Sequence, residues 1–147
     1  MKLHRLPAVV VLLLTVFSAH AFDFKAIGDE PTVMYDAPTV KGIKRFIAPP
    51  GMPVEIVHVT GSWSKVRDAA GDMSWVETRS LGMKRTVVVQ AANAKVRARA
   101  EDSAPVVFSA DKGVLLEVAE PAASGWIKVK HRDGQIGHVR ATEVWGI

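Results

Sequence analysis

The chain contains no cysteine among its 147 residues. This absence excludes disulfide bonds, a cysteine nucleophile, a thiolate metal site and a lipid-modified N-terminal cysteine. Histidine is also scarce. Beyond Ala21 only three histidines remain, and no two of them have the spacing of metal ligands: His58, His131 and His138. We therefore expect no metal site and no cofactor.

The sequence also lacks the motifs of the common enzyme classes. It has no Gly-x-Ser-x-Gly nucleophile elbow and no glycine-rich phosphate loop. Adjacent acids occur at residues 29–30 and 101–102. Neighbouring side chains point apart in an extended chain, so these acids do not form the facing carboxylates of a glycosidase. We expect no catalytic residues and no enzymatic activity.

The charge of the chain is small. The formal net charge is +4, of which Lys2 and Arg5 supply two. Residues 22–83 carry a net charge of −1 and residues 84–147 a net charge of +3, without any strip of mixed basic and aromatic residues. This distribution argues against a nucleic-acid partner and leaves open an anionic wall polymer as a ligand of the second half.

The segment 1–21 has the features of a secretory signal peptide. Lys2 and Arg5 precede an apolar run over residues 6–17, and residues 19–21 (AHA) form a small-x-small cleavage site. The apolar run is too short to span a bilayer. We expect cleavage after Ala21 and no stable membrane insertion afterwards. Export without disulfides indicates a bacterial protein that is periplasmic or secreted.

The remainder of the chain repeats itself. Residues 61–67 (GSWSKVR) and 71–76 (GDMSWV) have counterparts in residues 124–130 (SGWIKVK) and 134–139 (GQIGHV), and both pairs of segments align at the same offset without a gap. Repetition at this spacing indicates two copies of one small domain. We expect a first domain at 22–83 and a second at 84–147. The short junction predicts that the two domains pack together.

Both copies contain short β-branched segments with alternating apolar and polar residues, and neither shows a sustained helical period. Val66 stands between polar neighbours, and Val129 has the same place in the second copy, so both valines are predicted to point inward. The same alternation predicts one shared face for three residues further upstream: Val54, Ile56 and His58. The sequence predicts an all-β fold with about five strands in each copy.

Each copy contains an opening segment, an irregular stretch, a Trp-x-Lys-Val strand, a tight turn and a returning strand. The segments that carry this series are 33–38, 62–66 and 75–76 in the first copy and 95–100, 125–129 and 137–139 in the second. The series resembles the bacterial SH3-like family of extracytoplasmic domains. Departures from that family occur at Arg99 and Glu101, where many members have small residues and proline, and at His138, which replaces the usual tryptophan.

The resemblance implies two tandem small SH3-like β-barrels after a cleaved signal peptide. It also implies binding without catalysis, most often to cell-wall peptides such as those of peptidoglycan or to other envelope proteins. The alternative function is a periplasmic protein–protein adaptor or a regulatory subunit of an envelope enzyme, with its docking surface between the barrels.

Aromatic residues of the first copy are the candidates for ligand contact. Tyr35 and Trp75 lie beside the long loop, where aromatic residues line the peptide groove of SH3-like domains. Asp36 and Trp63 complete the candidate ligand-binding set. For Trp63 a structural role, as a large ring that covers one end of a small barrel, remains the alternative.

The second copy lacks two of these aromatic residues. His138 stands at the place of Trp75, and Ala98 is aligned with Tyr35. We therefore expect the first copy to bind the ligand and the second copy to stabilise it. Trp126 is expected to be mainly structural, and Trp145 is expected to pack against the first copy.

Overall fold

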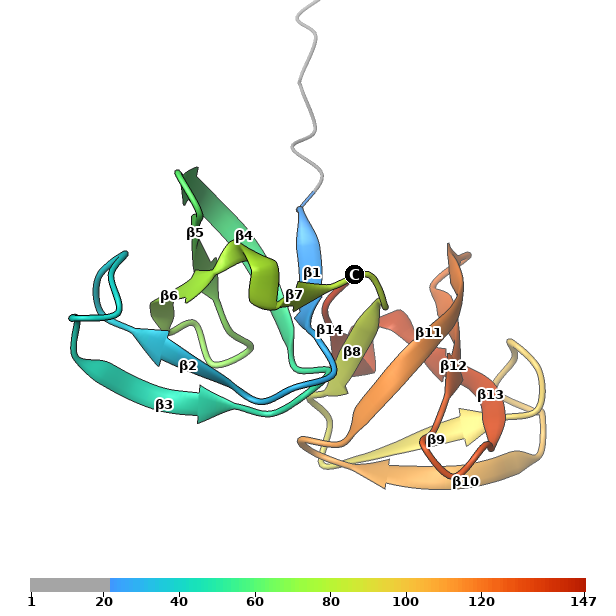
Figure 1. The fold of residues 1–147 in the computed structure, drawn as a ribbon. Coiled ribbons are helices and arrows are strands. Elements are labelled where there is room, and N and C mark those ends of the chain that lie inside the picture. The colour runs from blue at the N-terminus through green and yellow to red at the C-terminus, as the bar shows by residue number, and fades with distance from the viewer. Residues whose placement is uncertain (1–21) are drawn as a thin grey trace, which may run out of the picture.

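The computed structural model describes residues 22–147, which form two seven-stranded antiparallel sheets and no α-helix (Figure 1). The strands of the first sheet are β1 (Phe24–Ile27), β2 (Thr32–Tyr35), β3 (Lys44–Ala48), β4 (Pro53–Thr60), β5 (Trp63–Arg67), β6 (Met73–Glu77) and β7 (Leu81–Gly82). The strands of the second sheet are β8 (Thr86–Val89), β9 (Asn93–Arg97), β10 (Val106–Asp111), β11 (Leu115–Ala123), β12 (Trp126–Lys130), β13 (Ile136–Arg140) and β14 (Val144–Trp145). Single 3-10 turns, Thr78–Ser80 and Ala141–Glu143, precede β7 and β14. The predicted signal peptide and its predicted cleavage site lie outside the described residues.

The two sheets have the same topology. The strand order is β3-β2-β6-β5-β4-β1-β7 in the first and β10-β9-β13-β12-β11-β8-β14 in the second, so each strand has a counterpart seven strands later. Two tandem copies of one all-β domain are therefore confirmed. Each copy has seven strands rather than about five. The two-residue strands β7 and β14 are too short to show a periodic pattern in the sequence.

The central strand of each domain alternates between core and surface as predicted. Val66 on β5 and Val129 on β12 are 1% and 0% exposed, respectively. Their neighbours Lys65 and Lys128 point to the outer face and are half-buried. The inward orientation of both valines is confirmed.

The prediction for β4 is wrong at His58. Val54 is fully buried and Ile56 packs against the core, but His58 is exposed. The cause is a β-bulge between Ile56 and His58, which pairs Ile56 with the inward Val66 and His58 with the outward Lys65. A bulge adds one residue to one strand and reverses the faces beyond it. His58 therefore lies on the outer face of the sheet.

The second domain has the more apolar core. Its cluster contains ten buried hydrophobic residues, against six in the first domain. One matched position shows the difference directly, because the buried Ser64 hydroxyl lies 2.8 Å from the Thr78 hydroxyl, whereas Ile127 is the fully buried counterpart of Ser64. The larger apolar core favours a greater stability of the second domain.

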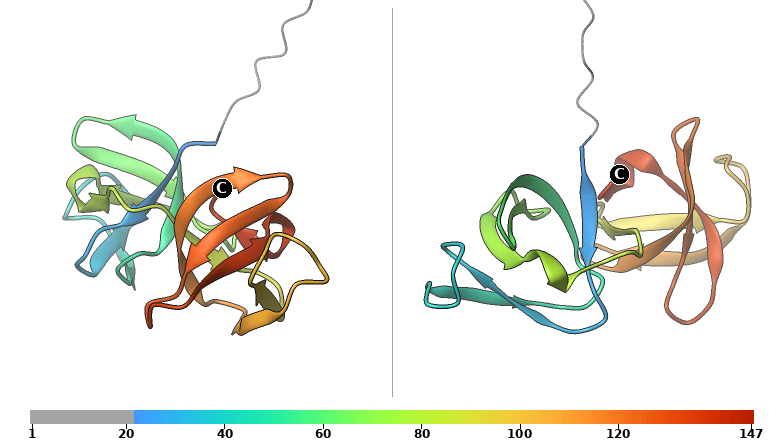
Figure 2. Two further views of the ribbon diagram at one scale, coloured as in Figure 1. Left: turned by 90° about the vertical axis from the view of Figure 1, so that its right-hand side faces the viewer. Right: turned by 45° about the horizontal axis from the view of Figure 1, so that its top comes forward.

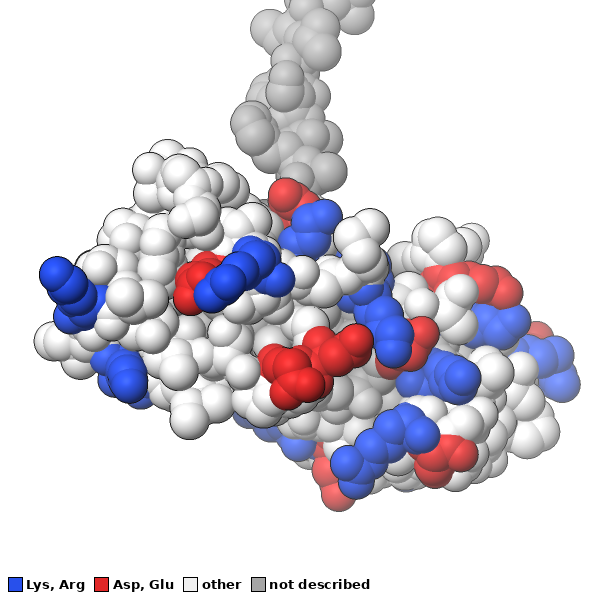
Figure 3. All heavy atoms as spheres, viewed as in Figure 1, with Lys and Arg blue, Asp and Glu red and all other residues white. Residues whose placement is uncertain are grey.

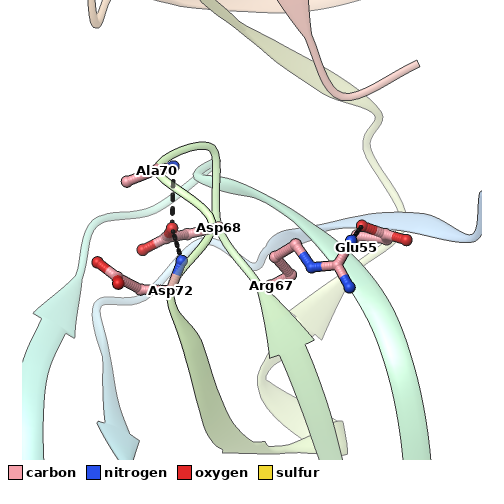
Figure 4. A network of polar contacts seen from close by, with 5 residues as sticks. All are labelled: Glu55, Arg67, Asp68, Ala70 and Asp72. Atoms are coloured by element: carbon pink, nitrogen blue, oxygen red, sulfur yellow. Dashed lines mark hydrogen bonds and ion pairs between the residues drawn. The ribbon is translucent and has the colours of Figure 1, made fainter.

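The β5–β6 turn is held by a single carboxylate (Figure 4). Asp68 Oδ1 accepts hydrogen bonds from the backbone N–H groups of Ala70 and Asp72, both at 2.9 Å. In the equivalent turn of the second domain the carboxylate is Asp133, which accepts from the Gln135 N–H at 3.0 Å. This hydrogen bond, and then that from His131, lowers the pKa of Asp133. Both turns thus fix the register of the strands that carry the outer face.

The two domains are in direct contact, as the short junction predicts. The ring of Trp145 on β14 packs edge-on against Phe24 on β1, with ring centroids 5.0 Å apart. The Thr86 hydroxyl donates a 2.6 Å hydrogen bond to the carbonyl of Gly51 across the junction. Figures 1 and 2 show β1 and the C-terminal segment side by side between the barrels. The predicted packing of Trp145 against the first copy is confirmed.

Candidate functional site

Four side chains form a row across the outer face of the first domain. His58 on β4, Lys65 on β5, Trp75 on β6 and Tyr35 on β2 are successive cross-strand neighbours in the antiparallel register. Direct cross-strand neighbours project from the same face of a sheet and touch one another. We call these four residues the aromatic row.

The middle of the aromatic row is an aromatic surface with a cation on it. Trp75 is half-buried, and the His58 ring meets it edge-on with centroids 6.2 Å apart. The Lys65 ammonium lies 6.0 Å from the centroid of the same ring. Within residues 22–147 no carboxylate forms an ion pair with Lys65. A partly solvated tryptophan face and an unpaired ammonium therefore lie side by side.

Tyr35 and Trp63 flank this surface as a packed pair. Their rings meet edge-on with centroids 5.5 Å apart, the favoured geometry for aromatic pairs. Tyr35 is only 8% exposed, whereas Trp63 remains half-buried. Trp63 thus offers more surface to a ligand than Tyr35 does. The buried ring of Tyr35 mainly holds the Trp63 ring in place.

Asp36 closes the long loop that follows the aromatic row. Its Oδ1 accepts a 2.7 Å hydrogen bond from the N–H of Ile43, and its own N–H donates to the Ile43 carbonyl at 3.1 Å. A Cβ on Gly42 would stand 2.9 Å from the same carboxylate oxygen and 3.1 Å from the Thr39 carbonyl, so a side chain there would disturb the contact that Asp36 makes. One carboxylate oxygen of Asp36 thus stabilises the loop, and the other, Oδ2, takes no part in that hydrogen bond.

The structure brings the four sequence-derived candidates together. Tyr35 pairs with Trp75 in the sheet register and contacts Trp63, and Asp36 follows directly in the chain. Sequence reasoning missed Lys65 and His58. The alternation that turns Val66 inward also turns Lys65 outward and could have identified it. No sequence signal marks the bulge that turns His58 outward.

The equivalent row in the second domain is charged. Glu120 on β11, Lys128 on β12, His138 on β13 and Arg97 on β9 are successive cross-strand neighbours. We call these residues the charged row. Arg97 pairs with His138 as Tyr35 pairs with Trp75, so the counterpart of Tyr35 is Arg97. The alignment of Tyr35 with Ala98 was one position out of register.

The charged row is largely satisfied within its own domain. The Lys128 ammonium donates a 2.8 Å hydrogen bond to Glu120, and this contact lowers the pKa of the Glu120 carboxyl. The Arg97 guanidinium donates to the Ala104 carbonyl at 2.9 Å. His138 Nδ1 is buried and has no hydrogen-bond partner among the described residues. The cations of this row thus already have acceptors, unlike Lys65.

Trp126, the counterpart of Trp63, is covered. It is 7% exposed, and the Arg140 guanidinium lies 4.5 Å from the centre of its ring. Arg140 is itself held by an ion pair with Asp102. This stacked and paired arginine leaves Trp126 in a structural position.

Among residues 22–147 no group of three or more His, Asp or Glu side chains lies close enough to hold a metal ion. None of these residues forms a helix long and apolar enough to cross a membrane.

Two solved structures are similar to this chain at a low level. The solved structure of NlpC2 from Trichomonas vaginalis aligns with 87% of this chain and 49% of its own length, at 11% sequence identity and a TM-score of 0.39. NlpC1 from the same organism aligns with 94% of this chain and 51% of its own, at 12% identity and a TM-score of 0.38. This chain therefore spans about half the length of either structure, and similarity at this level does not bear on function. No curated protein matches the sequence.

A sequence-family match, unlike these structural similarities, identifies the family, because it covers both halves of the chain. The sequence profile of the bacterial SH3 domain matches residues 28–82 and again residues 90–146. These ranges cover most of both sheets and hold both outer rows. The chain belongs to the bacterial SH3 domain family, of which it contains two tandem copies.

Proposed function

We propose that this chain is an exported, non-enzymatic binding protein whose first domain binds an extended peptide of the bacterial cell wall. The observation that carries the proposal is the aromatic row. It combines a half-buried tryptophan face with the Lys65 ammonium, which has no carboxylate partner among residues 22–147.

The chemistry of the aromatic row suits such a ligand. Extended peptides dock into aromatic grooves because flat rings bury their side chains and backbone without a large loss of conformational entropy. Wall stem peptides are short, extended and partly anionic. Trp75 and Trp63 supply the rings, and Lys65 supplies a charge for a carboxylate.

The second domain has the complementary role. Lys128 and Arg97, the two basic residues of its charged row, already have acceptors, and Trp126 is covered by Arg140. Its larger apolar core makes it a firm support, and the first domain packs on it through the contact of Phe24 with Trp145. This assigns binding to the first copy and support to the second.

The proposed compartment rests on the sequence of residues 1–21. A wall ligand requires export, for which the apolar run and the Ala21 cleavage site provide the signal. The exported protein should have the mass of a chain that begins at Phe22. A mature form that retains residues 6–17 would exclude this export route.

Retention on purified sacculi tests the function. The wild-type protein should co-sediment with sacculi, and Trp75→Ala should weaken retention by about 5- to 150-fold, the range for an aromatic anchor. The matched control is His138→Ala, the same position in the second domain. Tyr35→Phe tests the hydroxyl while keeping the ring that packs on Trp63.

The outcomes separate the possibilities. Loss of retention in Trp75→Ala but not in His138→Ala supports the first domain as the binding site. Equal losses in both variants, with unchanged melting temperatures, would place the contact elsewhere. If the wild-type protein does not co-sediment at all, wall binding is excluded.

A protein–protein adaptor is the second candidate, and one feature of the first domain favours it. Strand β3 lies at an edge of the sheet, and three apolar side chains on it or in the loop before it are more than half exposed: Val40, Ile43 and Ile47. An exposed apolar edge strand is suited to pairing with a strand of another protein. Capture of a specific envelope protein that Ile47→Lys abolishes, without sacculus binding, would favour this function.

A further inference from the structure

A cleft of about 650 Å³ lies at the junction of the two domains. Pro50 and Gly51 line it from the first domain, and residues 114–117 and 130–132 line it from the second. Its volume falls within the range of small-molecule and peptide pockets. The cleft is separate from the aromatic row, none of whose residues line it.

Three cations line the cleft without partners. Within residues 22–147, Lys84, Lys130 and Arg132 form no ion pair. The single carboxylate in the lining is Glu117, which is a cross-strand neighbour of Lys130 but makes no ion pair with it. In the view of Figure 3, Lys and Arg side chains lie over the second domain, interspersed with Asp and Glu side chains.

Part of the cleft wall is apolar, beside the polar side chains of Thr86 and His131. Val114 and Leu115 are half-buried there, whereas the side chain of Leu116 belongs to the core of the second domain. Positive charge in a concave site with partly apolar walls attracts anions more strongly than the same charge on an open surface, because the surroundings screen it less. An apolar wall also favours a ligand that carries hydrophobic groups between its charges.

The two sides of the cleft are held together by a buried hydrogen bond. Thr86 is 8% exposed, and its hydroxyl donates to the Gly51 carbonyl at 2.6 Å. This contact joins the first strand of the second domain to the β3–β4 loop of the first. The cleft is therefore preformed and does not require the domains to move before a ligand binds.

We propose that this inter-domain cleft is a binding site for a short acidic peptide segment, in which carboxylates meet Lys84, Lys130 and Arg132 and an apolar side chain packs on Leu115. A peptide fits better than a fully charged polyanion, because a polyanion has nothing to place against the apolar wall. The site goes beyond the proposed function, since it uses none of the residues of the aromatic row.

The test is a titration of the purified protein with a synthetic pentapeptide that has two glutamates on either side of a leucine. NMR of the backbone amides should show shifts around Thr86 and Leu115. The double variant Lys130→Ser/Arg132→Ser should bind at least about tenfold more weakly, the effect expected from losing one charge-assisted hydrogen bond. The matched control is Lys41→Ser/Lys44→Ser, which removes two exposed cations of the first domain outside the cleft.

Other ligands and one further variant define the alternatives. The same peptide with glutamines in place of glutamates should not bind; equal binding would overturn the role of the cations. Polyphosphate that binds as tightly as the acidic peptide would show a general polyanion site and overturn the peptide assignment. No shift with the acidic peptide also overturns the proposal. Trp75→Ala should leave this titration unchanged, so failure of the cleft and failure of the aromatic row give different results.

Discussion

The most direct test of the fold is the replacement of Val66 or Val129 by aspartate. Each valine is the central inward residue of its domain, at 1% and 0% exposure. Removing a buried valine side chain forfeits about 1.5–3 kcal/mol of transfer free energy. An unpaired carboxylate in the same place costs several kcal/mol more. The stability of a domain of this size is about 3–9 kcal/mol, so either variant should unfold its domain.

The assay is thermal unfolding followed by far-UV circular dichroism, with controls that make the same chemical change at an outward position. Met73→Asp and Ile136→Asp occupy equivalent places in the two domains, at 40% and 47% exposure. They stand opposite Arg67 and Lys130 in the sheet register, so a new carboxylate there faces a cation. We expect both controls to melt within a few degrees of the wild type. Val66→Asp and Val129→Asp should lack a native transition in the domain that carries the change.

The refuting result is a reversal of this pattern. If the valine variants melt like the wild type while the control variants unfold, the faces of β5 and β12, and of their neighbours β6 and β13, are opposite to those described. If all four variants melt like the wild type, the cores described here do not hold the domains together.

Two further predictions concern the outer faces. Trp126→Ala should lower the free energy of unfolding by about 3–5 kcal/mol, the range for a buried aromatic ring. Trp75→Ala removes a half-buried ring and should lower it less. Equal losses of the free energy of unfolding, measured in urea, would contradict the different roles of the two tryptophans. Lys128→Met should raise the pKa of Glu120 towards its ordinary value, because the lowered pKa depends chiefly on the hydrogen bond from Lys128. A carboxyl with a lowered pKa stabilises the folded state above its unfolded pKa, and this contribution is lost as pH falls through the folded pKa; an NMR titration in which the Glu120 pKa is the same in both proteins would contradict the assignment.

The sequence is sufficient to predict the architecture, because repetition and alternation are local signals. The repeated Trp-x-Lys-Val segment predicts two copies, and the polar neighbours of Val66 predict its inward orientation. The short junction predicts the contact of Trp145 with the first domain. Each of these inferences needs only neighbouring residues or a fixed spacing.

The sequence is not sufficient to predict which side chains face one another across strands. The difference in residue number between equivalent positions of the two copies is not constant. The segment from Glu120 to its cross-strand partner Lys128 is one residue longer than the equivalent segment from His58 to its partner Lys65. The additional residue in β11 lies where the register with β12 is irregular. The offset that aligns the two Trp-x-Lys-Val segments therefore matched Tyr35 with Ala98 instead of Arg97. Irregular pairing of this kind depends on contacts between strands and leaves no mark in local alternation.

The corrected alignment strengthens the case for different roles of the two copies. If Ala98 were the counterpart of Tyr35, the second domain would only have lost an aromatic side chain. With Arg97 there, three of the four positions in the row have changed together: Tyr35, His58 and Trp75 correspond to Arg97, Glu120 and His138. Lysine remains at the fourth position, but it has gained a carboxylate partner only in the second domain. An ion pair between this lysine and a carboxylate of the same domain adds a modest amount to the free energy of unfolding. The first domain forgoes that pair and leaves an ammonium beside a tryptophan face, the arrangement expected where the missing partner belongs to a ligand.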